Sequence, residues 1–252
     1  MQAANKDGLD SALADRDEIA RFNALAASWW DPNGPMKPLH RLNPVRIGFL
    51  KEAFAGHFGR DRNGMHPFGG LNLLDIGCGA GLVAEPMARL GFDVTAIDLA
   101  EENIAAAKAH ATLEGLAIDY RSTPLENLPE ATTYDAITLL EVVEHVPDVP
   151  AFVAEAAKRL KPGGMLIAST LNRTMKAYAL AIFGAEYVLR WLPVGTHDWN
   201  KFVTPDELDD AFASAGLVPH ERAGMVFNPL ANSWRLSGDC DVNYLASATR
   251  PS

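Results

Sequence analysis

The sequence is poor in cysteine and in basic residues, and each shortage excludes a class of protein. Only two cysteines, Cys78 and Cys240, occur among 252 residues, too few for a disulfide framework or a cysteine-rich zinc site, so we expect a reducing compartment. Lysine and arginine total 22 against 32 acidic residues, which gives a net charge of −10. This sign disfavours a protein that gains affinity by neutralising phosphates. We therefore expect no nucleic-acid partner.

Long hydrophobic runs are also missing. The strongly apolar, charge-free stretch from Ala177 to Ala185 is well short of the ~20 residues that a membrane-spanning helix needs. The first residues of the sequence carry several acids and no apolar core, unlike a signal or transit peptide. We expect a cytoplasmic protein with no transmembrane segment.

The pattern that is present is an alternation of short apolar runs and helical stretches from Leu71 onward. This alternation is typical of βαβ units and predicts an α/β, Rossmann-like fold, a mostly parallel sheet with helices on both of its faces. The predicted core covers residues 71–252. Seven strands are predicted, at LNLLDIG, FDVTAID, AIDYRS, YDAITLL, GMLIAST, LVPHERAG and VNYLASATR. Helices are predicted between them, at Leu82–Leu90, Glu101–Glu114, Pro150–Leu160 and Pro205–Ala215.

An N-terminal helical cap is predicted over residues 1–58. Apolar residues recur at helical spacing from Ile19 to Trp29, and a second amphipathic stretch runs from Val45 to Phe58. Between them, WWDPNGPMKPLHRLNP contains four prolines and is expected to interrupt the helices. Residues 59–70 form a polar, glycine-rich connector to the core.

A glycine-rich loop follows the first predicted strand and contains Gly77, Gly79 and Gly81. Glycines at this point let the backbone turn tightly and let a ligand approach the main chain, at the sheet edge where such folds bind ligands. A dinucleotide-binding fingerprint would place its third glycine at position 82, which is leucine. The loop therefore predicts a nucleotide-type site and disfavours an NAD-dependent oxidoreductase.

Asp98 ends the second predicted strand. A carboxylate there can accept hydrogen bonds from both hydroxyls of a ribose and would repel a 2′-phosphate. The predicted ligand therefore has a free ribose diol, as S-adenosylmethionine and NAD both do. The alternative is that the glycines only make a turn and that Asp98 only caps the helix beginning at Glu101.

A group of titratable residues follows the fourth predicted strand. Leu140 and Glu141 are expected to border the cofactor, and Glu144 and His145 to face the substrate. His145 can act as a base near neutral pH. Alternatively, Glu141, Glu144 and His145 could together hold a divalent cation such as Mg²⁺, or the segment could be a surface turn whose acids cap the next helix.

Several segments resemble the ubiquinone-biosynthesis O-methyltransferase family, which belongs to the class I S-adenosylmethionine-dependent methyltransferases. The resemblance runs from about Ile19 to Tyr244. Its segments are WWDPNGPMKPLHRLNPVR, LLDIGCGAGLVAEPMARLG, EVVEHVPD, STLNRT, GAEYVLRWLPVGTHDWNKF, TPDEL and NPLANSWRLSGDCDVNY. The resemblance implies methyl transfer to phenolic hydroxyls of polyprenylated intermediates, 2-polyprenyl-6-hydroxyphenol and 3-demethylubiquinol, with other ubiquinone-biosynthesis proteins as further partners.

The resemblance also assigns residues. It implies cofactor binding by Arg46, Asp75, Gly77, Gly79, Gly81, Asp98 and Leu140, the last at a position where the family commonly has methionine. Arg46 is expected to pair with the cofactor carboxylate, and a surface salt bridge is its alternative. The resemblance further implies the E-x-x-E-H residues, Glu141, Glu144 and His145, as Mg²⁺ ligands in eukaryotic members.

A polyprenylated substrate lies in the bilayer, so part of the chain is expected to reach the membrane. An insertion at 173–201 follows the fifth predicted strand, and its Met175–Leu192 stretch is rich in aromatic residues and carries Lys176 and Arg190. Such a stretch can lie among anionic headgroups, which predicts peripheral association with the inner membrane. The alternative is that it only covers the active site. A non-catalytic scaffold that binds lipid intermediates is the rival to an enzyme.

Overall fold

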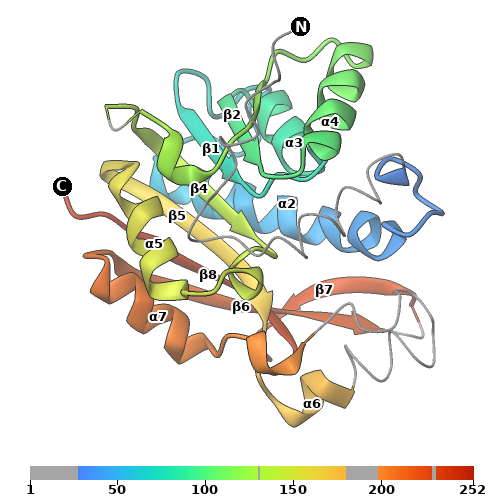
Figure 1. Ribbon diagram of the computed structural model, residues 1–252, viewed down its shortest axis with the longest axis vertical. Helices are drawn as coiled ribbons and strands as arrows, with labels where there is room; N and C mark the ends of the chain where they lie inside the picture. The colour runs from blue at the N-terminus through green and yellow to red at the C-terminus, as the bar shows by residue number, and fades with distance from the viewer. Residues whose placement is uncertain (1–27, 130, 180–197, 229–230) are drawn as a thin grey trace, which may run out of the picture.

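A sheet with helices on both faces forms the centre of the structure (Figure 1), a computed structural model that describes residues 28–129, 131–179, 198–228 and 231–252. In the described part of the chain the sheet has eight strands in the order β3-β2-β1-β4-β5-β8-β6-β7. Strands β3 to β5 of that order are mutually parallel, and β8, β6 and β7 are antiparallel to their neighbours. The strands are β1 Asn72–Ile76, β2 Asp93–Asp98, β3 Asp119–Ser122, β4 Tyr134–Leu140, β5 Leu160–Leu171, β6 Val218–Asn228, β7 Ser233–Ser237 and β8 Asn243–Thr249.

The predicted α/β fold is confirmed, with one strand more than the predicted seven. The additional strand is β7, which pairs with the end of β6 from Gly224 to Asn228. Strand β6 therefore continues four residues past the predicted LVPHERAG. Most of β7 is exposed, so its sequence lacks the buried alternation by which a strand is recognised.

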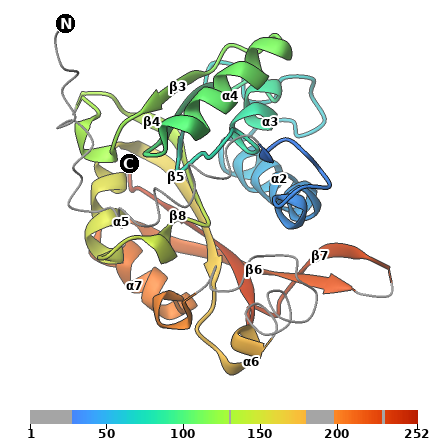
Figure 2. The same ribbon diagram turned by 45° about the vertical axis from the view of Figure 1, so that its right-hand side comes forward.

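Two layers of helices cover the sheet, as Figures 1 and 2 show. One layer consists of α2, α3 and α4, and the other of α5 and α7. The helices are α2 Lys37–His57, α3 Ala84–Arg89, α4 Glu101–Leu113, α5 Val149–Lys158, α6 Met175–Ala177 and α7 Pro205–Ser214. Their bounds lie within two residues of the predictions for α3, α4, α5 and α7. The capping box predicted for α7 is present, since Glu207 N–H donates to Thr204 Oγ1 and Thr204 N–H to Glu207 Oε2.

The N-terminal region differs from the prediction in where its helix begins. Helix α2 starts at Lys37 and runs through Pro44, which was expected to interrupt it. A helix-interior proline costs ~3 kcal/mol, whereas each large apolar side chain that α2 buries stabilises the fold by about 1.5–3 kcal/mol. Four such residues, Leu42, Phe49, Leu50 and Phe54, are buried on α2, so packing outweighs the proline. The predicted helix before Trp29 lies outside the described residues.

The connector at 59–70 is not wholly polar. Phe68 is completely buried and stacks on Phe92 with ring centroids 4.4 Å apart. It also contacts the edge of Phe54. This aromatic group ties α2 to the start of β2 and so fixes the N-terminal helix against the parallel half of the sheet.

Candidate functional site

The glycine loop connects β1 to α3 at the carboxyl edge of the sheet. Gly77 and Gly81 have positive φ angles of 71° and 92°, which side chains other than glycine rarely adopt. A Cβ atom on Gly77 would lie 2.3 Å from Val142, and one on Gly81 would lie 2.2 Å from the Tyr120 hydroxyl. The positive φ angles and the lack of room for a Cβ atom therefore both require glycine at these two positions. The main chain of the loop lies close to Val142 and Tyr120 there.

Asp98 lies beside this loop because β2 is the neighbour of β1. Its Oδ2 accepts a hydrogen bond from Gly79 N–H and its Oδ1 from Ala100 N–H, both at 2.8 Å. Burial raises the pKa of the carboxyl, and the two amide donors oppose that shift. Asp98 thus holds the start of α4 and at the same time fixes the glycine loop, so the two sequence interpretations are not exclusive.

Asp75 lies beneath the loop on the central strand. It is buried, and its Oδ1 accepts a 2.7 Å hydrogen bond from Thr138 on the adjacent strand β4. Burial raises the pKa of Asp75 to about 7, although the Thr138 bond opposes the shift. The side chain therefore links two strands inside the protein.

The raised pKa of Asp75 predicts a dependence of stability on pH. The folded protein holds a proton that the unfolded chain releases above about pH 3.8, so this contribution to stability is lost as pH rises through about 7. The Asp75→Asn variant keeps the acceptor for Thr138 and removes the titration. Between pH 5 and pH 8, the free energy of unfolding of wild type should fall by about 1–3 kcal/mol relative to Asp75→Asn.

Urea unfolding of both proteins at several pH values measures this difference. The exposed Asp210 provides the matched control, because Asp210→Asn makes the same chemical change at the surface. A wild-type curve parallel to that of Asp75→Asn over the whole range would contradict the prediction.

Glu141 directly follows β4 in a strained conformation and forms an ion pair with a buried arginine. Its φ angle is 55°, a region that costs a non-glycine residue of order 1–3 kcal/mol. Its Oε1 accepts a 2.7 Å hydrogen bond from Ser169 Oγ and lies 2.6 Å from Nη2 of Arg46. Arg46, on α2, is only 4% exposed, so the surface salt bridge considered for it is excluded. The predicted cofactor residue Leu140, also buried, directly precedes Glu141.

Glu144 and His145 lie in the short 3₁₀ turn Val143–His145. Glu144 is buried, and its Oε2 accepts a 2.8 Å hydrogen bond from Thr170 Oγ1 on β5. Burial, and secondly the charge of Glu141, raise the pKa of Glu144 to about 7. Glu144 therefore faces β5 rather than an open substrate side, whereas His145 is partly exposed.

The predicted cation site is not formed. Among the described residues, no three His, Cys, Asp or Glu side chains converge as metal ligands would. The reason is local, since Glu141 is held by Arg46 and Ser169 while Glu144 is held by Thr170. The E-x-x-E-H residues of this chain do not fit Mg²⁺ in this arrangement.

Reasoning from the sequence missed several contacts of the site. They join residues far apart in the chain, and they involve Thr138, Ser169 and Thr170 on strands and Asn103 on α4. Polar residues within predicted strands could have suggested the first three. No spacing connects Asn103 to its hydrogen-bond partner, Trp29.

Comparison with known proteins identifies the type of domain. A family model described as "Methyltransferase domain" matches residues 39–221. The "Ubiquinone biosynthesis O-methyltransferase" of Paramagnetospirillum magneticum is 54% identical over 232 residues, which cover 92% of this chain and 93% of that protein. The protein of the same name from Methylobacterium nodulans is 54% identical over 238 residues, covering 94% and 96%.

Solved structures agree in fold. The magnesium protoporphyrin IX methyltransferase of Synechocystis PCC 6803, solved with bound SAH, superposes with a TM-score of 0.65 over 94% of this chain and 100% of that one, at 19% identity. The N-methyltransferase NodS of Bradyrhizobium japonicum, also solved with SAH, gives a TM-score of 0.60 over 94% and 98%, at 18% identity. At these identities the likeness concerns the fold, and it confirms the class I methyltransferase architecture.

Proposed function

Because the chain belongs to the family of ubiquinone biosynthesis O-methyltransferases, we propose that it transfers a methyl group from S-adenosylmethionine to a phenolic hydroxyl of a polyprenylated ring. The substrates are of the 2-polyprenyl-6-hydroxyphenol and 3-demethylubiquinol type. The observation that carries the proposal is the glycine loop, whose Gly79 N–H is bound by the Asp98 carboxylate at one sheet edge. A dinucleotide-binding fingerprint has its third glycine at position 82, which is leucine in this chain, and this difference argues against NAD as the ligand.

The residues at this edge suit S-adenosylmethionine. Asp98 would accept hydrogen bonds from the ribose hydroxyls, and the glycine loop would receive the amino-acid part of the cofactor against its main chain. Arg46, whose guanidinium is buried beside Glu141, would pair with the cofactor carboxylate, for which its planar fork is suited. When bound, the cofactor supplies a methyl group on a sulfonium, which is a good leaving group.

The chain's own contribution is alignment and removal of a proton. Holding the reacting oxygen in line with the methyl group exploits proximity effects of up to ~7–11 kcal/mol. A phenol, like Tyr, ionises near pH 10, so a base must favour the phenolate at neutral pH. We assign this role to His145, the partly exposed member of its turn. Two glutamates support this turn. Glu144 accepts a hydrogen bond from Thr170 on β5, and Glu141 pairs with Arg46 on α2.

Methylation of a short-chain prenyl catechol tests this proposal. With S-adenosylmethionine, the protein should form the O-methyl product and release demethylated cofactor, and NAD should not bind. Because Glu141 and Glu144 are held by protein partners, EDTA should leave the rate unchanged. A rate that vanishes with EDTA and returns with Mg²⁺ would instead support a cation at these residues. Binding of the catechol without product would support the scaffold.

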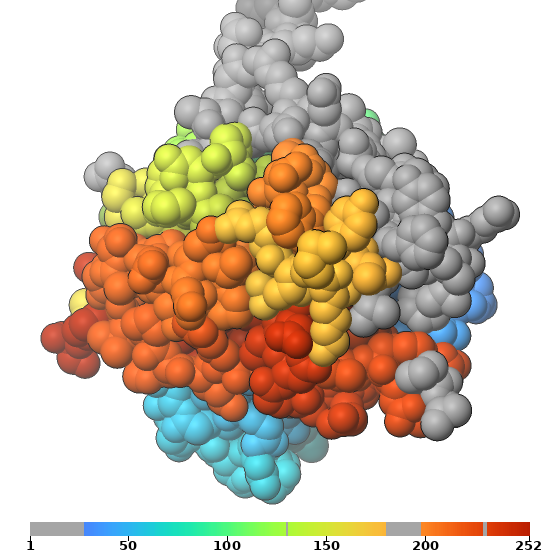
Figure 3. Space-filling model, turned by 90° about the horizontal axis from the view of Figure 1, so that it is seen from below, coloured from blue at the N-terminus to red at the C-terminus, as the bar shows by residue number. Residues whose placement is uncertain are grey.

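Membrane contact through Met175–Leu192 is the part of the proposal that concerns where the enzyme works. Residues 180–192 lie outside the described residues. At the start of the stretch, Met175 is 74% and Tyr178 46% exposed, and Figure 3 shows the face on which α6 lies. No helix among the residues described is long and apolar enough to cross a bilayer.

Lys176 contributes less to such contact than its charge suggests. Its Nζ lies 2.5 Å from Asp239 Oδ2 and 3.2 Å from Asp241 Oδ2. A basic residue near anionic lipid is worth about 1 kcal/mol, and two neighbouring carboxylates offset that attraction. We therefore assign the larger share of the contact to the apolar side chains.

Vesicle cosedimentation measures the contact. The intact chain should bind vesicles containing anionic lipid more strongly than a chain lacking Met175–Leu192. Met175→Asp should also weaken binding, because it places a charge on an exposed apolar side chain. Leu113→Asp is the matched control, since Leu113 is even more exposed, at 84%, but lies at the end of α4. Equal binding of the intact and shortened chains would exclude the contact.

A further inference from the structure

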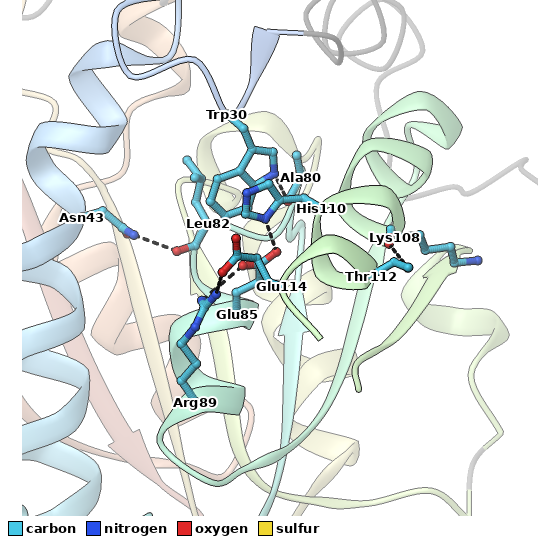
Figure 4. Close-up of polar contacts among 10 residues, drawn as sticks. All are labelled: Trp30, Asn43, Ala80, Leu82, Glu85, Arg89, Lys108, His110, Thr112 and Glu114. Carbon is cyan, nitrogen blue, oxygen red and sulfur yellow. Dashed lines mark hydrogen bonds and ion pairs between the residues drawn. The ribbon is translucent and has the colours of Figure 1, made fainter. Parts of the chain in front are cut away.

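Trp30, in the segment before α2, binds the main chain of the glycine loop. Its Nε1 donates a 3.0 Å hydrogen bond to the carbonyl oxygen of Ala80, a completely buried residue 50 positions later in the chain. Ala80 stands between Gly79 and Gly81. The acceptor therefore lies inside the loop, as Figure 4 shows.

This bond restrains a peptide group that glycine would otherwise leave free. The Ala80 carbonyl and the Gly81 N–H belong to one planar peptide group. The N–H side donates a 2.9 Å hydrogen bond to the Cys78 carbonyl, and the carbonyl side accepts from Trp30. Gly81 has a φ angle of 92°, and glycine adopts positive and negative φ angles with similar ease. Trp30 therefore supplies a restraint that the loop sequence itself does not.

The indole of Trp30 has a fixed position. It stacks on the His110 ring of α4, with centroids 3.5 Å apart and planes inclined by 3° (Figure 4). His110 Nδ1 lies 2.6 Å from Oε1 of Glu85, which is completely buried, and Arg89 pairs with the other carboxylate oxygen at 3.2 Å. Glu85 lies in the first turn of α3, and its own N–H donates to the Gly81 carbonyl at 3.0 Å. The contacts thus form a ring that begins and ends at the glycine loop.

Two neighbouring contacts hold the loop from the same part of the chain. The ring of Trp29 fills the space beside Gly79, where a Cβ atom would approach it to 2.6 Å. Asn43 on α2 donates a 2.7 Å hydrogen bond from Nδ2 to the carbonyl of Leu82 (Figure 4). Trp30 is the member of this group that binds the peptide between Ala80 and Gly81.

We propose that Trp30 is a positioning residue of the cofactor site, which acts by holding the Ala80–Gly81 peptide of the glycine loop in one orientation. The inference rests on the proposed function, in which this loop receives the amino-acid part of S-adenosylmethionine. A loop that is held before the ligand arrives loses less freedom on binding, which raises affinity.

Calorimetric titration with S-adenosylhomocysteine tests the effect on affinity. Trp30→Phe keeps an aromatic ring for the stack on His110 and removes the indole N–H. It should weaken binding about 2- to 10-fold, the effect of one lost neutral hydrogen bond. Trp234→Phe is the matched control, because it makes the same chemical change on β7, where the ring packs against Phe227. This variant should bind like wild type.

Amide hydrogen exchange measures the restraint on the loop directly. In the free protein, Gly81 N–H should exchange about 2- to 10-fold faster in Trp30→Phe than in wild type, because opening of the peptide no longer breaks the indole bond. Gly91 provides the internal reference, since its N–H also donates over 2.9 Å, to the Ala88 carbonyl. Its exchange should be the same in both proteins.

Kinetics distinguish positioning from a general structural role. In Trp30→Phe, KM for S-adenosylmethionine should rise while kcat at saturating cofactor stays the same, as expected when only binding is affected. Both parameters should be unchanged in Trp234→Phe. Thermal unfolding verifies that each variant is folded.

The outcomes separate this inference from the proposed function. A folded wild type that does not bind S-adenosylhomocysteine overturns the proposed function, and the inference with it. A wild type that binds, with Trp30→Phe indistinguishable from Trp234→Phe in affinity, overturns the inference alone. Unchanged exchange of Gly81 N–H in Trp30→Phe would also overturn it, because the indole would then not restrain the peptide.

Discussion

Replacing His145 by alanine should lower kcat for methyl transfer by about 10²- to 10⁴-fold, the usual contribution of a positioned general base. The catechol must lose its proton as the oxygen attacks, and a phenol near pKa 10 is mostly protonated at neutral pH. KM for S-adenosylmethionine should change little, because His145 is assigned to the substrate rather than to the cofactor. Initial rates at saturating cofactor measure the loss.

The pH profile makes this result specific. As pH rises toward 10, the substrate ionises without help, so the deficit of His145→Ala should shrink. His220→Ala is the matched control, because His220 is exposed on β6 and bonds to Thr249. Full activity of His145→Ala at neutral pH would contradict the assignment of His145 as the base. A deficit that stays constant up to pH 10 would show that His145 contributes in some way other than by removing the proton.

Asp98→Asn should raise the Kd for S-adenosylhomocysteine by about 10²- to 10⁴-fold, since two hydrogen bonds to a charged group contribute ~1.5–3 kcal/mol each. In wild type, Gly79 N–H and Ala100 N–H each donate to one carboxylate oxygen. Asparagine replaces one of these oxygens by an NH₂ group, which cannot accept either bond. The loop and the start of α4 would then lose a shared acceptor. Calorimetry measures the affinity, and thermal unfolding separates it from loss of structure.

A ligand change tests the same assignment from the other side. An S-adenosylhomocysteine analogue without the 2′- and 3′-hydroxyls should bind wild type much more weakly than the parent compound. It should bind Asp98→Asn and wild type alike. Asp93→Asn, an exposed residue at the start of the same strand, should behave as wild type. If Asp98→Asn still prefers the parent compound over the analogue as strongly as wild type does, the ribose is held elsewhere.

The fold was predictable because its signals are local. Each βα unit is predicted by a short apolar run and the helical stretch after it. Because β1 and β2 are neighbours in the sheet, the Gly77 loop after β1 lies next to Asp98 at the end of β2. The capping box of α7 joins residues three positions apart. The helix through Pro44 was not predictable in this way, because the packing that outweighs the proline comes from the whole buried face of α2.

The connections within the site depend on distant parts of the chain. The motifs point to Arg46 and Glu141 separately, but the two residues pair only because the fold brings Arg46 on α2 to the residue that follows β4. The hydrogen bond between Trp29 and Asn103 spans 74 residues. Sequence patterns indicate which face of an element is buried, and they contain no information on which polar groups meet there.

The most direct test of the proposed activity uses S-adenosylmethionine with a deuterated methyl group and a short-chain prenyl catechol. Mass spectrometry should find one trideuteromethyl group on a ring oxygen of the catechol, together with an equal amount of S-adenosylhomocysteine. A folded protein that binds both compounds and forms no methylated product would contradict the assignment as an O-methyltransferase.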